Sequence, residues 1–268
     1  MTTQPALPLD IRLTNALAAT LFVLAGLAVV VTLLGWVMRL PVFAIHGVTV
    51  TGDVTHYNAI TLRANVMPRL QGTFFTLDVH AARKAFEGMP WVRQAVVRRD
   101  FPNRLRVELQ EHQAVALWGA DDDSHLVNSF GEVFEANVGE LEQDNLPRLI
   151  GPDNQSAQVL TMHRTLAPLL ATLELQVAQL ELTARGGWHA QLDNGASLEL
   201  GSGSTEELVA RTQRFLKTVT QATSHYKRTP EQLEAVDLRH PDGYAIRLAG
   251  VSTLDGDGIS KAARQGNR

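Results

Sequence analysis

The chain has 268 residues, of which 45% are hydrophobic and 19% charged, with a formal net charge of −4 at pH 7. It contains no cysteine, which excludes disulfides and cysteine-ligated metal sites but leaves the cellular compartment open. Residues 42–109 carry nine basic and five acidic side chains, whereas residues 110–147 carry nine acidic and no basic ones, which indicates a boundary between two modules. The basic residues alternate with apolar ones, and this pattern is typical of a solvated sheet face rather than a nucleic-acid site.

Residues 13–38 form an apolar segment of 26 residues without a charged side chain. A helix needs about 20 such residues to cross a bilayer, and Trp36 stands where an interfacial anchor belongs. A buried core helix would need a polar face at this length, and a cleaved signal peptide has a shorter apolar region of about 7–15 residues. We therefore expect an uncleaved membrane helix over 13–38, preceded by a tail of residues 1–12. Because Arg12 and Arg39 flank it one on each side, the charges leave its orientation open.

The next part of the chain predicts the order strand, helix, helix, strand, strand. Alternation over 42–50 indicates the first strand, and the spacing of apolar residues indicates helices over 57–67 and from 79 to Pro90. Strands are expected over 91–99 and 104–110, around the turn 100–103. In the last strand Leu105, Val107 and Leu109 should face the core.

The remaining sequence predicts short strands separated by turns, with two helices between them. Hairpins are expected over 126–134, around 193–195, and over 235–249 with its turn at 241–243. Residues 173–177 alternate and then resume at Leu180 out of phase, which predicts a bulge. Helices are expected over 156–170 and 205–221, the second with Ser204 and Glu207 in a capping box. The polar segment after Gly250 predicts a disordered tail over 251–268.

No catalytic constellation is present in the sequence. There is no cysteine nucleophile and no His-Glu-x-x-His motif, and no two of the nine histidines have the spacing of metal ligands. The segment 201–204 resembles a phosphate-binding or nucleophile loop only superficially, because it lacks the lysine and the spacing that such loops need. We therefore expect a binding protein with no enzyme activity, catalytic residue, cofactor or metal.

The run from Pro90 to Trp118 resembles the FtsQ/DivIB family of bacterial cell-division proteins. Segments 43–52, 126–134 and 236–243 resemble the first strand after the membrane, an early hairpin and the closing hairpin of this family, in the same order. The resemblance implies an α+β protein with one N-terminal transmembrane helix, a POTRA domain (β-α-α-β-β) over 43–112, and a larger, mainly antiparallel β-domain with two or more helices over 113–250. The strand-helix-helix-strand-strand order derived from the residues is the POTRA order.

The resemblance also implies a location and partners. It places the chain in the bacterial inner membrane at the division septum, with a cytoplasmic N-terminus and periplasmic domains. It implies a scaffold that binds FtsB in complex with FtsL, joins other divisome proteins and helps control septal peptidoglycan synthesis. No nucleic acid or small-molecule substrate is expected.

In this family the last strand of the β-domain pairs with a strand of FtsB, and the affinity of such pairing comes from main-chain hydrogen bonds. His240 and Leu248 stand where some members carry tyrosine and tryptophan. A recruitment surface on the POTRA domain would comprise Gln94, Val97 and Arg99. Carried onto this sequence, the FtsB site is Arg239, His240, Asp242, Gly243, Ala245, Ile246, Arg247 and Leu248.

Two other functions compete with the scaffold. A POTRA-type translocation or assembly factor usually presents its POTRA modules to an outer-membrane barrel, and no barrel follows Gly250 in this sequence. A membrane-anchored hydrolase would need a nucleophile or a metal site, and the sequence offers neither.

Overall fold

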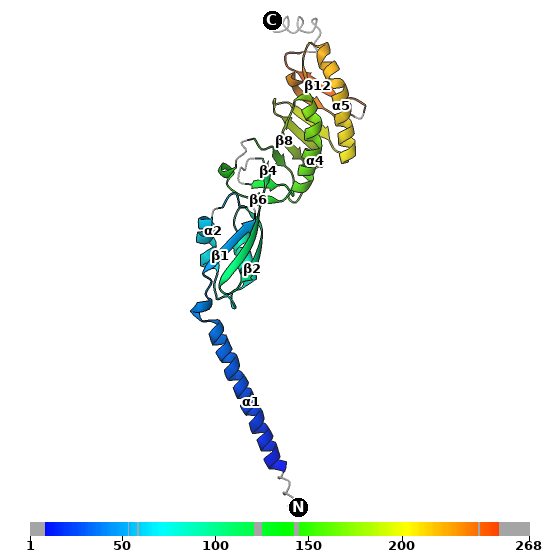
Figure 1. The fold of residues 1–268 in the computed structure, drawn as a ribbon. Coiled ribbons are helices and arrows are strands. Elements are labelled where there is room, and N and C mark those ends of the chain that lie inside the picture. Colours follow the sequence, from blue (N-terminus) through cyan, green and yellow to red (C-terminus); the bar gives the residue numbers. More distant parts are fainter. Residues whose placement is uncertain are drawn as a thin grey trace, which may run out of the picture. The chain divides into compact units, whose positions relative to one another are not determined.

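The computed structural model describes residues 9–52, 54–57, 59–120, 125–141, 145–240 and 242–251. Contacts divide the chain into two compact units, Met1–Glu111 and His112–Arg268 (Figure 1). Of the two predicted tails, residues 1–8 and 252–268 lie outside the described residues.

The first unit begins with the helix α1 (Leu9–Met38), which contains the whole predicted membrane segment. The most apolar stretch of 18 residues within 13–38 has a mean hydropathy of 2.7, and none of this stretch is buried in the protein. Water would strongly disfavour so much exposed apolar surface, whereas a bilayer matches it. The helix therefore fits a single-pass membrane protein.

A three-stranded sheet with two helices follows α1. The sheet has the order β1-β3-β2, with β1 parallel and β2 antiparallel to β3, and the predicted strand-helix-helix-strand-strand order is confirmed. The first strand begins at Gly47 rather than at residue 42, because Pro41 opens a short 3-10 helix instead. The elements are η1 (Pro41–Phe43), β1 (Gly47–Gly52), α2 (Ala59–Val66), η2 (Met67–Arg69), α3 (Val79–Glu87), β2 (Val92–Asp100) and β3 (Arg104–Glu111).

The core of this domain lies between the sheet and its helices. Leu105, Val107 and Leu109 of β3 are at most 2% exposed, as their alternation predicts, and they belong to the same buried cluster as Phe86 of α3. Asp78 caps α3 by accepting hydrogen bonds from the backbone N–H groups of His80 and Ala81. These two bonds hold the pKa of the Asp78 carboxyl below its usual value.

The second unit contains one sheet with the strand order β12-β11-β10-β9-β8-β7-β4-β5-β6. Its strands are β4 (Ala114–Trp118), β5 (His125–Asn128), β6 (Val133–Glu135), β7 (Arg148–Ile150), β8 (Val177–Leu182), β9 (Trp188–Leu192), β10 (Ser197–Gly201), β11 (Leu233–Asp237) and β12 (Ala245–Leu248). Its helices are η3 (Val138–Glu140), α4 (Ser156–Leu170), η4 (Ala171–Leu173), α5 (Thr205–His225) and η5 (Pro230–Gln232).

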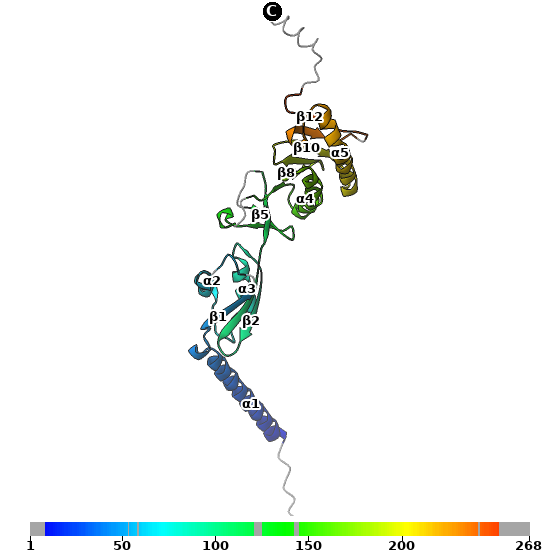
Figure 2. The same cartoon turned by 45° about the horizontal axis from the view of Figure 1, so that its top comes forward.

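Two long helices connect neighbouring parallel strands of this sheet. α4 joins β7 to β8 and α5 joins β10 to β11, and both strand pairs are parallel, as is β4 with β7. β7 and β10 run in the same direction, since β8, β9 and β10 pair antiparallel in turn. Right-handed crossovers from both strands therefore place both helices on the same face of the sheet (Figure 2). The sheet is mixed, although most of its pairs are antiparallel.

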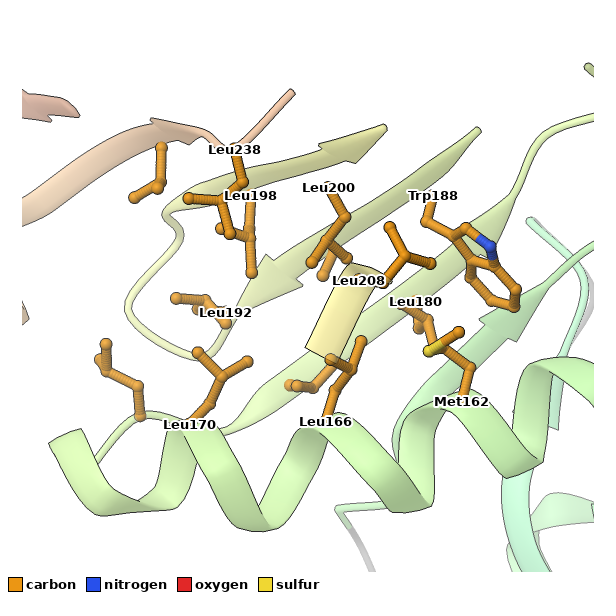
Figure 3. Packing of buried hydrophobic residues seen from close by; sticks show 14 of the residues in the cluster. Met162, Leu166, Leu170, Leu180, Trp188, Leu192, Leu198, Leu200, Leu208 and Leu238 are labelled. Carbon is orange, nitrogen blue, oxygen red and sulfur yellow. The ribbon is translucent and has the colours of Figure 1, made fainter. Parts of the chain in front are cut away.

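The main core fills the space between these helices and the sheet. Met162, Leu166 and Leu170 of α4 point toward the sheet (Figure 3), where Met162 lies beside Leu180 and Trp188 and Leu170 beside Leu192. All six side chains are at most 3% exposed. α5 contributes the buried face predicted from its spacing: Leu208, Thr212, Phe215 and Val219. The capping box of Ser204 and Glu207 at its start is also present.

One prediction for this sheet needs correction. The alternating segment 173–177 was expected to be a strand, but η4 ends at Leu173, Glu174 has a φ of 61°, and β8 begins only at Val177. The bulge is confirmed, as the pairing of β8 with β9 shifts register between Val177 and Gln179. The strands β4 and β7 have no counterpart among the predicted elements.

Candidate functional site

The strand β12 forms one edge of the nine-stranded sheet and pairs only with β11 among the described residues. An edge strand presents half of its backbone N–H and C=O groups to the outside, ready to pair with a strand of another chain. The hairpin predicted over 235–249 is present, with shorter strands than expected. The predicted site residues from Arg239 to Leu248 therefore lie on β12 and on the connection that precedes it, with Pro241 outside the described residues.

Backbone geometry identifies which groups of β12 face outward. Ala249 donates its N–H to Gln232 O on the β11 side, and Leu238 donates its own to Glu199 O of β10. Because successive residues of a strand alternate, the N–H groups of Ala245 and Arg247 then face β11. The N–H and C=O groups of Ile246 and the N–H of Leu248 face the open side, whereas Leu248 O accepts the N–H of Val251 at 3.2 Å.

The side chains of β12 divide between the two faces of the sheet. Ala245 and Arg247 are exposed on the face without helices. Ile246 is partly buried and packs against the main core, and Leu248 is 5% exposed within that core. The side chain of Leu248 therefore packs inside the domain, and what this residue offers on the open edge is its backbone N–H.

The connection to β12 carries most of the polar side chains of the predicted site. His240 and Asp242 are exposed, and Gly243 is partly exposed. Arg239 donates hydrogen bonds to Asp237, the last residue of β11, from Nε to Oδ1 at 2.9 Å and from Nη2 to Oδ2 at 2.6 Å. Its backbone N–H also bonds Asp237 Oδ1 at 3.0 Å.

These contacts with Arg239 lower the pKa of the Asp237 carboxyl to about 2, and the same contacts raise the pKa of the Arg239 guanidinium. Asp237 stands opposite Ala245, the first residue of β12. The ion pair therefore fixes the path of the chain where it leaves β11 and before it returns as the edge strand.

Tyr244 also positions the edge, although the predicted site does not include it. Its ring packs edge-to-face against Phe215 of α5 at 5.2 Å, and its hydroxyl lies 2.8 Å from Thr218 Oγ1. These contacts tie the start of β12 to the helix that covers the sheet. The sequence feature that could have identified Tyr244 is its place beside a Pro-Asp-Gly turn. Tyrosines that are partly buried usually form a hydrogen bond through the hydroxyl.

The predicted recruitment residues of the first domain do not lie on one surface. Gln94 is exposed on β2, whereas Val97 is 8% exposed and belongs to the core of that domain. Arg99 lies on the same side of the strand as Val97, and its Nη2 donates to Leu77 O at 2.7 Å. What the three residues share is the strand β2, which is an edge of the three-stranded sheet.

Comparison with known proteins supports the resemblance over nearly the whole chain. Residues 43–112 match the FtsQ-type POTRA domain, and residues 116–239 match the C-terminal domain of the cell-division proteins FtsQ and DivIB, a match that ends before β12. The chain is 37% identical to the cell division protein FtsQ of Thiomonas arsenitoxydans, over 97% of this chain and 94% of that protein. It is 38% identical to FtsQ of Burkholderia pseudomallei, over 91% and 96%.

A third relative, FtsQ of Bordetella pertussis, is 36% identical over 90% of this chain and 92% of its own length. The match to the Thiomonas protein leaves out only about 3% of this chain, so it includes both the membrane helix and the edge strand. Together with the strand order of the first domain and the mixed sheet of the second, these likenesses place the chain in the FtsQ/DivIB family of cell-division proteins.

Proposed function

We propose that this protein is a non-catalytic divisome scaffold that binds FtsB, in complex with FtsL, by adding a strand of FtsB to the open edge of β12. Through this contact it helps control septal peptidoglycan synthesis. The observation that carries the proposal is the position of β12 at the end of a nine-stranded sheet, with the N–H and C=O groups of Ile246 and the N–H of Leu248 facing outward. Strand addition uses such groups for affinity.

Three features of the edge support this mode of binding. β12 is held in place by Tyr244 and by the pair of Asp237 and Arg239, so that little backbone ordering remains to be done when a partner strand arrives. Arg247 and Ala245 are exposed beside the open edge and can select the partner's side chains. The opposite edge, β6, is a strand of three residues, one residue shorter than β12.

We infer an orientation with the N-terminus in the cytoplasm and both folded units in the periplasm, at the septum. One helix that fits a bilayer and relatives that are cell-division proteins support this topology. The relatives are named as cell-division proteins, and this favours a divisome scaffold over a translocation factor.

Replacement of Ile246 by proline tests the edge directly. Proline removes the N–H that faces outward, while the bonds that face β11 come from the neighbouring residues. We expect Ile246→Pro to weaken capture of FtsB with FtsL by at least about tenfold, because a lost bond and a distorted edge together cost more than about 1.4 kcal/mol. Pull-down of the full-length proteins from detergent measures this loss.

Ile246→Ala is the matched control, since it removes apolar atoms at the same position and retains the N–H. The proposal predicts that this variant binds FtsB much better than the proline variant does. Far-UV circular dichroism and the thermal midpoint establish that both variants are folded. Wild-type binding by a folded Ile246→Pro variant would contradict pairing at β12.

A further inference from the structure

Four phenylalanines of the first unit are in contact with one another close to the end of α1. The rings of Phe43 and Phe75 lie 5.0 Å apart, those of Phe74 and Phe75 5.2 Å apart, and those of Phe74 and Phe101 5.8 Å apart, all edge-to-face. The residues come from η1, from the segment before α3 and from the turn between β2 and β3. We call Phe43, Phe74, Phe75 and Phe101 the phenylalanine patch.

Two of the four rings in the patch are exposed, and Phe43 and Phe74 are partly buried. Phe101 is 73% exposed and Phe75 41%, and Val42 beside Phe43 is 65% exposed. The fully buried aromatics of this domain, Phe86 and Trp91, are 1% exposed and lie in its core. Exposed, contiguous apolar side chains on a folded domain mark a surface that something covers.

The covalent chain and its hydrogen bonds keep the patch near the membrane. Phe43 follows Met38 by five residues, which span at most about 18 Å even when fully extended. Thr73 Oγ1 donates to Met38 O, the last residue of α1, at 2.7 Å, and Phe74 N–H donates to Phe43 O at 2.8 Å. His46 N–H donates to Asn103 O at 3.0 Å, which holds the turn that carries Phe101 against the same segment.

We propose that the phenylalanine patch inserts into the interfacial region of the bilayer that α1 crosses, and so docks the first domain on the membrane surface. Aromatic side chains favour this depth, where Trp36 of α1 also stands. The occupant of the patch is thus lipid, and its apolar surface continues that of the membrane helix.

The charges around the patch are compatible with an anionic lipid surface. Arg39 directly follows α1 and is exposed, so it can meet phosphate groups at the same level. Asp100, which precedes Phe101, is paired with Arg106 at 3.1 Å between Oδ2 and Nη2. The carboxylate that directly precedes Phe101 in the chain therefore carries its own counterion.

The absence of cysteine makes the depth of the patch measurable at single sites. Phe101→Cys and Phe130→Cys each provide one site for a nitrobenzoxadiazole fluorophore on the full-length protein. Phe130 is the matched control because it is an exposed turn phenylalanine, 57% exposed, in the second unit. Both labelled proteins are placed in nanodiscs of phosphatidylethanolamine and phosphatidylglycerol, with or without lipid that carries a nitroxide near the headgroup end of its acyl chain.

The proposal predicts severalfold stronger quenching by the nitroxide lipid at position 101 than at position 130, and a blue-shifted emission at position 101 only. Adding Phe75→Ser to the labelled Phe101→Cys protein should reduce that quenching, because the patch then loses an exposed ring. Equal quenching at the two positions would overturn the proposal. A blue shift at position 101 without lipid quenching would also overturn it, since a second copy or another protein would then cover the patch.

Discussion

Asp237 and Arg239 show how two neighbouring side chains determine where the edge strand starts. Both carboxylate oxygens of Asp237 accept hydrogen bonds from the Arg239 side chain, and Oδ1 also accepts its backbone N–H. The bidentate geometry suits arginine and would be lost with lysine. Arg239 was expected to lie in the binding site, and the structure gives it this local structural contact.

The titration of Asp237 tests that contact. Its pKa is lowered from 3.8 to about 2, so the carboxylate stabilises the folded state above about pH 4 and loses this contribution as the pH falls toward 2. We expect Arg239→Gln to move the titration midpoint of Asp237 up toward 3.8, read from its carboxyl carbon resonance by NMR. Arg247→Gln, which alters an exposed arginine of the adjacent strand, should leave it unchanged. An ordinary midpoint in the unaltered protein would refute the contact.

At the scale of elements, α5 was predictable because local signals agree with its tertiary role. Ser204 Oγ accepts the N–H of Glu207 at 3.3 Å, and Glu207 Oε2 accepts the N–H of Ser204 at 3.0 Å. The helix starts there and lays Leu208, Phe215 and Val219 into the core. The capping residues and the spacing of the apolar residues are both local features of the sequence, so they can be recognised without an alignment.

Removal of this cap should cost measurable stability. We expect Ser204→Ala to lower the free energy of unfolding by about 1 kcal/mol, because the N–H of Glu207 then loses its partner at the start of a 21-residue helix. Urea unfolding followed by circular dichroism measures the change. Glu207→Gln should cost less, because glutamine can also complete a capping box. Equal stability of Ser204→Ala and the unaltered protein would contradict the assigned role.

Other elements depend on partners that are distant in sequence. β4 and β7 pair in parallel, and residues 119–147 separate the strands, so short segments such as Arg148–Ile150 carry little signal of their own. Residues 173–177 alternate as a strand would, yet the chain leaves α4 through η4 and turns at Glu174. The path of the chain out of α4 therefore determines the structure of this segment, and the alternation of its residues does not.

At the scale of the whole molecule, the architecture follows from a membrane helix, a domain with POTRA strand order and a mixed sheet whose helices cover one face. The membrane segment and the first domain could be predicted from composition and periodicity. The proposed binding edge could not, because main-chain hydrogen bonds leave no side-chain pattern, and the expectation of such an edge came from family resemblance alone. Two of the predicted site residues do not lie on the surface, because the side chains of Leu248 and Val97 are buried in the cores of their domains.

The central claim is that β12 accepts a strand of FtsB along its open edge. Amide hydrogen exchange of the full-length protein, with and without the FtsB–FtsL complex, tests this claim at the backbone groups concerned. We predict that the amides of Ile246 and Leu248 become strongly protected on binding, whereas those of Ala245 and Arg247, which face β11, change little. Unchanged exchange at Ile246 and Leu248 under saturating partner, or protection confined to β6, would contradict the account.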